Sequence, residues 1–413
     1  MAPNLPAYVG ADAIGELIRY LRAQHLDHFT LVADGNTYRV LGEAIQRSLD
    51  GEGFDARAVV LPGKEIIPDE HSVMQILVQA GRESRTYLAV GSGTVNDLTR
   101  FVSHRARSDF ISIPTAPSVD AYTSPTSSLI LAGLKQTVLA QPPIAIFADL
   151  PTLCAAPRSM IASGFGDMLG KFTSLADWRL GHLLWDEPYS EAVAQRLRAA
   201  LEGCIHHVEA IGRGDSEGIR ALMDGLLESG RGMLEFGNGR PAAGSEHYVS
   251  HYLDMKLIWE NRPAVLHGAK VGLATLGVAK RYEQIAQLTR QQAADRLRAS
   301  VPPDRTQEVE RIRTAYPPIA DQIVAEQAPF LNLAGHAYNQ LKEKITEQWD
   351  KIQDIAAAVP PSDDLASLFR TVGGATEPAG LGLGEAELAL ALEVSHYLRN
   401  HFTVLKLNRI LGL

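Results

Sequence analysis

Cysteine is scarce in this sequence, which has only Cys154 and Cys204 among its 413 residues. So few thiols in a chain of this length favour a reducing compartment over a disulfide-stabilised secreted protein, and we expect a cytoplasmic protein. Neither cysteine has the spacing typical of metal ligands. Any metal site must therefore be built from histidine and carboxylate side chains.

Long apolar runs and an excess of positive charge are also missing. No uninterrupted apolar stretch approaches the roughly 20 residues that span a bilayer, so we expect no membrane insertion. The first residues, "MAPNLPAYVG", show no basic region followed by an apolar run, and we expect no signal peptide. The net charge of −9 argues against nucleic acid as a partner. With 46% hydrophobic and 21% charged residues, the composition is that of a folded protein with room for two or three domains.

The first part of the chain alternates strand-like and helix-like segments. This order predicts a parallel sheet covered on both faces by helices. A glycine between two apolar runs in "LILAGLKQTVLAQ" also suggests a hairpin over residues 129–141. The strand-like segments are 28–34, 55–63, 86–93, 109–115 and 143–150, and the helix-like segments are 35–50, 69–82 and 96–105.

After about residue 155 the pattern becomes that of long amphipathic helices, with a connecting loop over 371–387. We therefore expect an α/β nucleotide-binding domain over residues 1–155 and an all-helical domain over residues 156–413. A crevice between them should lie at the carboxyl ends of the parallel strands. The predicted helices cover 157–182, 190–211, 216–235, 246–260, 264–287, 305–325, 337–358 and 384–411.

The stretch "VGSGTVNDLTRF", residues 90–101, combines a strand end, a glycine turn and a helix start. Gly91 and Gly93 allow the backbone to approach a ligand closely. A helix that begins near Val95 or Asn96 would offer unpaired N–H groups to an anion. The spacing is neither that of a GxGxxG motif nor that of a Walker A loop, so a simple strand-to-helix turn remains an alternative to a phosphate-binding loop.

A second polar loop follows the next predicted strand, in "ISIPTAPSVDAYTS" (111–124). The alternative is a capped turn that binds no ligand. Two such loops at neighbouring strand ends are what a dinucleotide site needs. The hydroxyl and carboxyl groups of this loop belong to Thr115, Ser118, Asp120, Thr123 and Ser124.

Three helical segments offer metal-binding side chains. His247 and His251 lie four residues apart on one helix face, and His267 begins another helix. Asp167 and Lys171 lie four residues apart on a third helix. One ligand from each of these helices would suit a divalent metal with an open position, although a satisfied or exposed histidine is the competing explanation. His206 and His207 lie inside a predicted helix, and we interpret them as structural or surface residues.

Taken together, the motifs "GSGTVND", "PTAPSVDAYTS", "GFGDMLGK", "SEHYVSH" and "LHGAKVG" resemble, in this order, those of the sn-glycerol-1-phosphate dehydrogenases. That family belongs to the superfamily of metal-dependent alcohol dehydrogenases, glycerol dehydrogenase and dehydroquinate synthase, and the chain resembles its bacterial members from about residue 5 to about residue 290. The resemblance implies a dehydroquinate synthase-like fold, NAD(H) or NADP(H) as cofactor, and one divalent metal ion, zinc or nickel.

Carried over position by position, the resemblance implies a role for individual residues. The metal ligands would be Asp167, His247 and His267, with Asp167, Asp120 and His251 near the substrate. Asp34 would lie near the adenosine ribose. The remaining nucleotide contacts would be Gly93, Thr94, Val95, Asn96, Asp97, Thr115, Ala116, Pro117, Ser118 and Ser124.

The resemblance implies reduction of dihydroxyacetone phosphate to sn-glycerol 1-phosphate, with Asp120, His251 and Lys171 as candidate catalytic residues. Asp120 or His251 could hold the substrate hydroxyls and lead a proton to the new alkoxide. Lys171 could either pair with Asp167 or reach the substrate phosphate. The alternatives are a dehydrogenase of unphosphorylated polyols, a cyclase on the same scaffold, and a non-enzymatic nucleotide-binding module. We expect small-molecule substrates and a homodimer.

Overall fold

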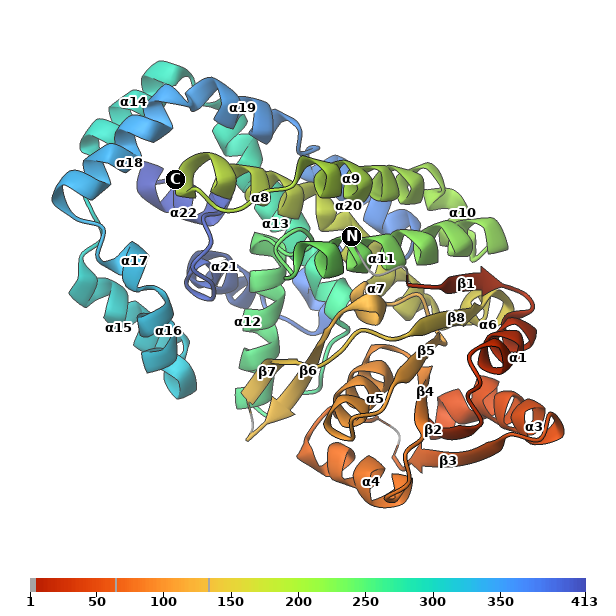
Figure 1. Ribbon diagram of the computed structural model, residues 1–413. Coiled ribbons are helices and arrows are strands. Elements are labelled where there is room, and N and C mark those ends of the chain that lie inside the picture. Colours follow the sequence, from red (N-terminus) through yellow and green to blue (C-terminus); the bar gives the residue numbers. More distant parts are fainter. Residues whose placement is uncertain (1–4, 64, 133) are drawn as a thin grey trace.

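The computed structural model describes residues 5–63, 65–132 and 134–413, and its N-terminal half is built on a six-stranded sheet (Figure 1). The strand order is β1-β8-β5-β4-β2-β3, and every neighbouring pair is parallel. The predicted parallel sheet is therefore confirmed. The strands are β1 (Ala7–Gly10), β2 (His28–Asp34), β3 (Asp55–Leu61), β4 (Thr86–Gly91), β5 (Phe110–Pro114) and β8 (Ala145–Asp149).

Strand β1 was not predicted. It has only four residues, too few to show a period, and it forms by pairing with β8, in which Ala7 lies opposite Ile146. Pairing with a strand so distant in sequence leaves no local signal.

Helices cover both faces of the sheet, because successive strand residues point to opposite faces. Leu31 of β2 packs with α1 (Ala13–Ala23) and α3 (Glu43–Gly51), whereas its neighbour Val32 packs with α4 (Glu70–Ala80) and α5 (Gly93–Arg105). The predicted helix 35–50 divides into α2 (Gly35–Thr37), a π-helical turn (Tyr38–Gly42) and α3.

Helix α5 begins at Gly93, earlier than the predicted start near Val95 or Asn96, and β4 ends at Gly91. A β-carbon on Gly91 would lie 2.5 Å from Cβ of Val95. The missing side chain lets the chain turn directly from strand into helix, which the apolar pattern alone does not show.

The predicted hairpin is present as β6 (Thr126–Leu131) and β7 (Leu134–Leu139), with Thr126 opposite Leu139. Gly133, on which this prediction rested, lies outside the described residues. The hairpin extends away from the six-stranded sheet and lies beside α12 (Ser245–Trp259) of the helical half (Figure 1).

In the described part of the chain, no strand follows Asp149, which confirms the helical second half. None of its helices is long and apolar enough to cross a bilayer. The helices are α6 (Leu150–Cys154), α7 (Arg158–Leu169), α8 (Lys171–Trp185), α9 (Glu191–His206), α10 (Val208–Arg213), α11 (Ser216–Phe236), α12, α13 (His267–Gln287), α14 (Arg290–Ala299), α15 (Arg305–Ala315), α16 (Ala320–Glu326), α17 (Ala328–Leu331), α18 (Gly335–Glu347), α19 (Trp349–Ala357), α20 (Ser362–Thr371), α21 (Glu385–Val394) and α22 (Val404–Leu411).

Several predicted helices are divided in the structure. The segment 157–182 breaks at Gly170, and 305–325 breaks after Tyr316, since a residue before proline is disfavoured in the helical region. The segments 190–211, 337–358 and 384–411 are also divided, without a proline at the break, and α20 was not predicted. Amphipathic periodicity continues through such breaks, so it does not locate them.

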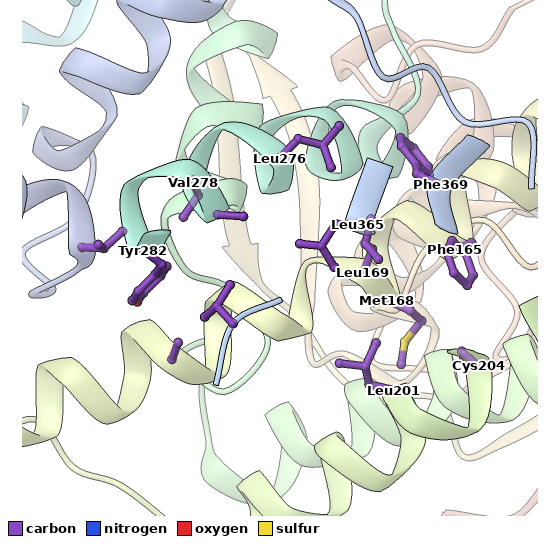
Figure 2. Packing of buried hydrophobic residues seen from close by; sticks show 14 of the residues in the cluster. Phe165, Met168, Leu169, Leu201, Cys204, Leu276, Val278, Tyr282, Leu365 and Phe369 are labelled. Atoms are coloured by element: carbon purple, nitrogen blue, oxygen red, sulfur yellow. The ribbon is translucent and has the colours of Figure 1, made fainter. Parts of the chain in front are cut away.

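Helices α7 and α13 form the centre of the helical half. Phe165 and Met168 of α7, Leu276 of α13 and Phe369 of α20 belong to one cluster of buried hydrophobic residues (Figure 2). A β-carbon on Gly268, at the start of α13, would lie 1.9 Å from the carbonyl oxygen of Ser163 in α7. The two helices can therefore cross in near contact only because position 268 has no side chain.

Candidate active site

The two polar loops predicted from the sequence lie together at the carboxyl edge of the sheet. Gly91 at the end of β4 lies opposite Pro114 at the end of β5, and the N–H of Thr115 donates to the carbonyl oxygen of Gly91 at 3.2 Å. A β-carbon on Gly93 would lie 3.3 Å from Val119. The start of α5 and the loop after β5 therefore form one surface.

The start of α5 has the features of an anion-binding site. Ser92 precedes the helix in an extended conformation, and its side chain makes no capping hydrogen bond. The first N–H groups of a helix lack intrahelical acceptors, so those of Gly93, Thr94 and Val95 are suited to a phosphate. Both alternatives, a phosphate-binding loop and a plain strand-to-helix turn, are compatible with this geometry.

Asn96 and Asp97, by contrast, use their side chains within the protein. Asn96 Oδ1 accepts a hydrogen bond from the Ser112 hydroxyl at 2.7 Å. Asp97 pairs with the buried Arg100 and accepts the N–H of Ser128 at 3.1 Å. These contacts fix α5 against β5 and against the hairpin. Both side chains therefore stabilise the turn between β4 and α5 through contacts within the protein.

The loop from Thr115 to Ser124 is held by hydrogen bonds at both ends. Tyr122 donates its hydroxyl to the carbonyl oxygen of Ala116 at 2.6 Å and lies 3.3 Å from the Ser118 hydroxyl. The Ser124 hydroxyl lies 2.9 Å from that of Thr126. At Pro117 the loop packs directly on α7, because a β-carbon on Gly164 would lie 1.8 Å from the Pro117 carbonyl oxygen.

Asp34, the predicted ribose contact, lies at the carboxyl end of β2 and caps α2. Its Oδ1 accepts the N–H groups of Asn36 and Thr37 at 2.7 and 2.9 Å. Both capping contacts use Oδ1, which leaves Oδ2 available to a ligand at the same edge of the sheet.

The three predicted metal ligands converge from three helices. One ligand atom each from Asp167 on α7, His247 on α12 and His267 on α13 lie within 4.8 Å of one another. Asp167 Oδ1 is 3.3 Å from His247 Nε2, and the two imidazole centroids are 5.3 Å apart. One carboxylate oxygen and two imidazole nitrogens are a donor set that fits zinc, nickel and similar divalent ions.

Each of these three side chains is oriented by a further contact. Glu246 Oε1 lies 2.8 Å from His247 Nδ1, and the Ser250 hydroxyl lies 3.3 Å from His267 Nδ1. The N–H of Asp120 donates to Asp167 Oδ2 at 3.0 Å. Such outer contacts keep ligand atoms directed at a common point and are typical of metal sites.

Charge interactions within the triad are strong because its groups are buried. Burial opposes ionisation of Asp167, but the Lys171 ammonium and His247 outweigh it and lower the pKa of Asp167. Burial likewise opposes protonation of His247, but the hydrogen bonds that its ring donates to Asp167 and Glu246 raise its pKa to about 9. At His267 burial dominates and lowers the pKa to about 3. The buried carboxylates of Asp167 and Glu246 are thus stabilised by positive charge next to His247, and a divalent cation would supply such a charge.

Lys171 lies fully buried beneath the triad. Its ammonium group is 2.9 Å from Asp120 Oδ2 and 3.5 Å from Asp167 Oδ1, and it donates to the carbonyl oxygen of Ala242 at 3.0 Å. Although burial opposes it, these two carboxylates raise the pKa of Lys171. Of the two roles considered for Lys171, the geometry matches pairing with Asp167.

Asp120 and His251 flank the triad. Asp120 Oδ2 also accepts the Ser229 hydroxyl at 2.7 Å, which leaves Oδ1 as the oxygen not used by these contacts. The His251 ring lies 5.6 Å from that of His267 and remains partly exposed. Burial, with nearby Lys135, holds the pKa of His251 well below its usual 6.5. Its imidazole is therefore neutral near pH 7.

Sequence reasoning missed several residues of this site. Three of them lie within or beside the histidine motifs quoted above, namely Glu246, Asp254 and Lys270. Their closeness in sequence to the candidate metal ligands was the signal that could have identified them. Lys135 had no signal, because it reaches Asp254 from β7, 119 residues away in the sequence. His206 and His207 lie at the end of α9, and His207 Nδ1 contacts the carbonyl oxygen of Gly203 at 2.8 Å, as expected for structural residues.

Comparisons with known proteins agree with this geometry. Residues 8–157 match the family described as iron-containing alcohol dehydrogenase. The chain is 38% identical over 400 residues to the glycerol-1-phosphate dehydrogenase [NAD(P)+] of Halalkalibacterium halodurans, covering 96% of this chain and 90% of the relative. The chain belongs to the glycerol-1-phosphate dehydrogenase family. The enzyme of that name from Bacillus subtilis is 44% identical over 282 residues, covering 68% of this chain and 72% of the relative.

Solved structures with the same fold are more distant in sequence. A probable glycerol dehydrogenase from Sinorhizobium meliloti superposes with a TM-score of 0.63 at 16% identity, covering 98% of this chain and 95% of the other. The glycerol dehydrogenase of Schizosaccharomyces pombe superposes with a TM-score of 0.62 at 16% identity, and the superposition covers 99% of this chain and 88% of the other. The family and the fold expected from the motifs are thus confirmed.

Proposed function

We propose that this glycerol-1-phosphate dehydrogenase family member catalyses the reversible reduction of dihydroxyacetone phosphate to sn-glycerol 1-phosphate with NADH or NADPH. The observation that carries the proposal is the convergence of Asp167, His247 and His267 within 4.8 Å. Asp167 is also joined to the loop after β5 through the Asp120 N–H. A carbonyl held at the triad would therefore lie near a nucleotide held at that loop.

Asp167, His247 and His267 would hold one divalent ion, zinc or nickel. The bound ion would polarise the ketone and stabilise the negative charge that hydride transfer places on its oxygen. The protein's contribution is to keep the two imidazoles and the carboxylate in place through Glu246, Ser250 and Asp120.

The nucleotide would bind along the carboxyl edge of the sheet. We assign the pyrophosphate to the N–H groups of Gly93, Thr94 and Val95, with Asn96 and Asp97 fixing that turn. Asp34 Oδ2 would accept the ribose hydroxyls, as an acidic residue does at the end of a strand in other dinucleotide folds. The remaining contacts would come from the loop after β5, through Thr115, Ala116, Pro117, Ser118 and Ser124.

Asp120 and His251 would handle the hydroxyl groups and the proton of the reaction. The Asp120 carboxylate is oriented by Lys171 and Ser229 through Oδ2, so its Oδ1 is the oxygen that we assign to the substrate. Neutral His251 can hold a hydroxyl and pass a proton toward the carbonyl oxygen during reduction. Lys171 contributes by keeping both carboxylates ionised.

We extend the proposal to the organisation of the protein. Residues 1–155 would form the nucleotide domain and residues 156–413 the metal and substrate domain. The chain would act as a homodimer in the cytoplasm, where the unpaired Cys154 and Cys204 would stay reduced. Light scattering at micromolar concentration tests the dimer directly.

The test of the activity is a steady-state assay of NADH and NADPH oxidation after the protein has been stripped of metal and reloaded with zinc or nickel. Dihydroxyacetone phosphate, dihydroxyacetone and glyceraldehyde 3-phosphate are compared as substrates. We expect metal-dependent activity with a strong preference for dihydroxyacetone phosphate. Equal kcat/KM on the two ketones would instead identify a dehydrogenase of unphosphorylated polyols.

A further inference from the structure

Two lysines share one carboxylate next to the substrate residues of α12. Lys135 of β7 places its Nζ 2.6 Å from Asp254 Oδ2, and Lys270 of α13 places its Nζ 2.8 Å from Asp254 Oδ1. The hairpin strand β7 and the consecutive helices α12 and α13 therefore meet at Asp254. One carboxylate balances only one of the two ammonium charges, so the cluster carries an unmatched positive charge.

The two lysines differ in accessibility. Lys270 is fully buried, and its Nζ also donates to the carbonyl oxygen of Val265 at 2.5 Å. The side chain of Lys135 is 21% exposed and that of Asp254 is 11% exposed. Lys135 can therefore meet a ligand from solvent without any rearrangement of the core.

The opposite arrangement of charge is found beneath the metal ligands. There Lys171 faces two carboxylates, Asp120 and Asp167, at 2.9 and 3.5 Å. One end of the site is thus rich in carboxylates and suits a cation, whereas the end at Lys135 and Lys270 is rich in ammonium groups and suits an anion.

The spacing along the helices places the two ends side by side. His247, His251 and Asp254 share one face of α12, and Asp254 lies about 4.5 Å along the axis from His251. On α13, Lys270 follows His267 by about one turn.

We propose that Lys135 binds the phosphate of the substrate, that the buried Lys270 adds positive charge behind it, and that Asp254 is the positioning residue that holds both lysines. This inference rests on the proposed function. A substrate phosphate lies only a few bonds from its carbonyl carbon, and it carries close to two negative charges near neutral pH, as a phosphomonoester does. Lys171 does not suit this role, because it is fully buried and its ammonium is already held by Asp120, Asp167 and the Ala242 carbonyl.

The hairpin connects this anion site to the nucleotide loop. Arg100 donates to the carbonyl oxygen of Thr126 at 2.9 Å, and Ser128 donates its N–H to Asp97 at 3.1 Å. The strand that follows, β7, lies beside α12 (Figure 1) and contains Lys135. Binding of the phosphate at Lys135 would therefore fix the ketone relative to the same frame that holds the cofactor.

The test is Lys135→Gln in the metal-loaded enzyme, assayed with dihydroxyacetone phosphate and with dihydroxyacetone. We expect kcat/KM for the phosphorylated ketone to fall by about 10-fold to 100-fold, which is typical of losing one charge-assisted hydrogen bond. The value for dihydroxyacetone and the KM for NADH should stay unchanged. Lys135→Arg should restore much of the loss. Lys256→Gln is the matched control, because Lys256 lies on α12 but pairs with Glu260.

Inorganic phosphate, used as an inhibitor, provides a second measurement that reports binding of the anion separately from kcat. It should compete with dihydroxyacetone phosphate in the wild type and inhibit Lys135→Gln at least several-fold more weakly. Equal losses on both ketones, a changed KM for NADH alone, or unchanged inhibition by phosphate would each overturn the phosphate site. A wild-type enzyme that prefers dihydroxyacetone phosphate would leave the proposed function standing in those cases, whereas a wild type without that preference would contradict both.

Discussion

Glu246 Oε1 lies 2.8 Å from Nδ1 of His247, the next residue along α12. The same carboxylate accepts the N–H of Gly244 at 2.7 Å and the hydroxyl of Thr173 at 2.6 Å. The contacts with Gly244, just before α12, and with Thr173 of α8 therefore hold the carboxylate in position next to the imidazole. The orientation of His247 toward Asp167 and His267 is thus built into the fold.

We predict that Glu246→Gln lowers metal affinity by about 10-fold to 100-fold, since removing an outer partner of a histidine ligand has effects of this size. The affinity is measured by titration against a chelator of known strength. Glu260→Gln, on an exposed carboxylate just after α12, is the control and should change nothing. Unchanged affinity in Glu246→Gln would mean that the carboxylate does not orient the ligand.

Replacing a ligand should remove the metal without unfolding the protein. We expect His267→Ala to purify with little bound zinc or nickel and to lack activity, because the two remaining ligands hold a divalent ion poorly. Elemental analysis and circular dichroism are the measurements. His206→Ala, away from the site, should keep both metal and activity. Full activity in rigorously metal-free wild type would contradict the assignment of the triad.

The close crossing of α7 and α13 predicts opposite effects for two glycine substitutions. Gly268→Ala must push α13 away from the Ser163 carbonyl and should cost about 1–3 kcal/mol of unfolding free energy or more, together with metal binding through His267. At Gly203 in α9 no atom lies within 4 Å of an added β-carbon, so Gly203→Ala should stabilise by up to about 1 kcal/mol. Chemical denaturation measures the unfolding free energy of both variants, and equal changes in the two would contradict the packing argument.

Two substitutions of Asp34 separate the effect of its charge on cofactor preference from the effect of its helix cap on stability. Asp34→Asn keeps an N-cap side chain for Asn36 and Thr37 and removes the charge, so it should shift the preference from NADH toward NADPH at nearly unchanged stability. Asp34→Ala should shift the preference similarly and also lose about 1 kcal/mol of stability. The ratio of kcat/KM for the two cofactors decides the point. A ratio that stays the same in both variants would show that Asp34 does not contact the ribose.

Lys406 gives a prediction about pH. It is fully buried, it donates to the carbonyl oxygens of Arg399 and His401 at 3.2 and 2.8 Å, and burial lowers its pKa from 10.5 to about 7. Between these values the unfolded chain holds a proton that the folded protein does not, so this group makes folding more stable as pH rises. The slope is about 1.4 kcal/mol per pH unit between about pH 7 and pH 10.5, and below about pH 7 this group no longer changes the stability because both states hold the proton.

Lys406→Met should therefore flatten the increase in unfolding free energy between pH 7 and pH 9 relative to the wild type. Urea denaturation at several pH values measures it. Lys351→Met, at an exposed lysine of α19, is the control and should leave the slope unaltered. Parallel pH profiles for wild type and Lys406→Met would contradict the burial argument.

Local signals in the sequence were sufficient to predict an element where the segment has a clear pattern of apolar residues of its own. β2 was predicted with the bounds that the structure shows, because seven residues with a buried apolar centre suffice to mark a strand. Asp167, His247 and His267 could be named because each lies in a motif that resembles a known family. The division of the long helical segments at Gly170 and His207 could not be located, because these breaks follow from how the helices pack.

The sequence by itself determined the alternation of strands and helices, the family and the three candidate metal ligands, since these depend on short-range patterns and on motifs. Only the tertiary structure decided which lysine faces which carboxylate. Lys171 is one turn from Asp167, and its burial against Asp120 requires the loop after β5 to pack beneath α7. Lys135 and Asp254 meet only because the hairpin lies against α12. Contacts between segments so far apart depend on the packing of the whole chain, because no local interaction brings such residues together.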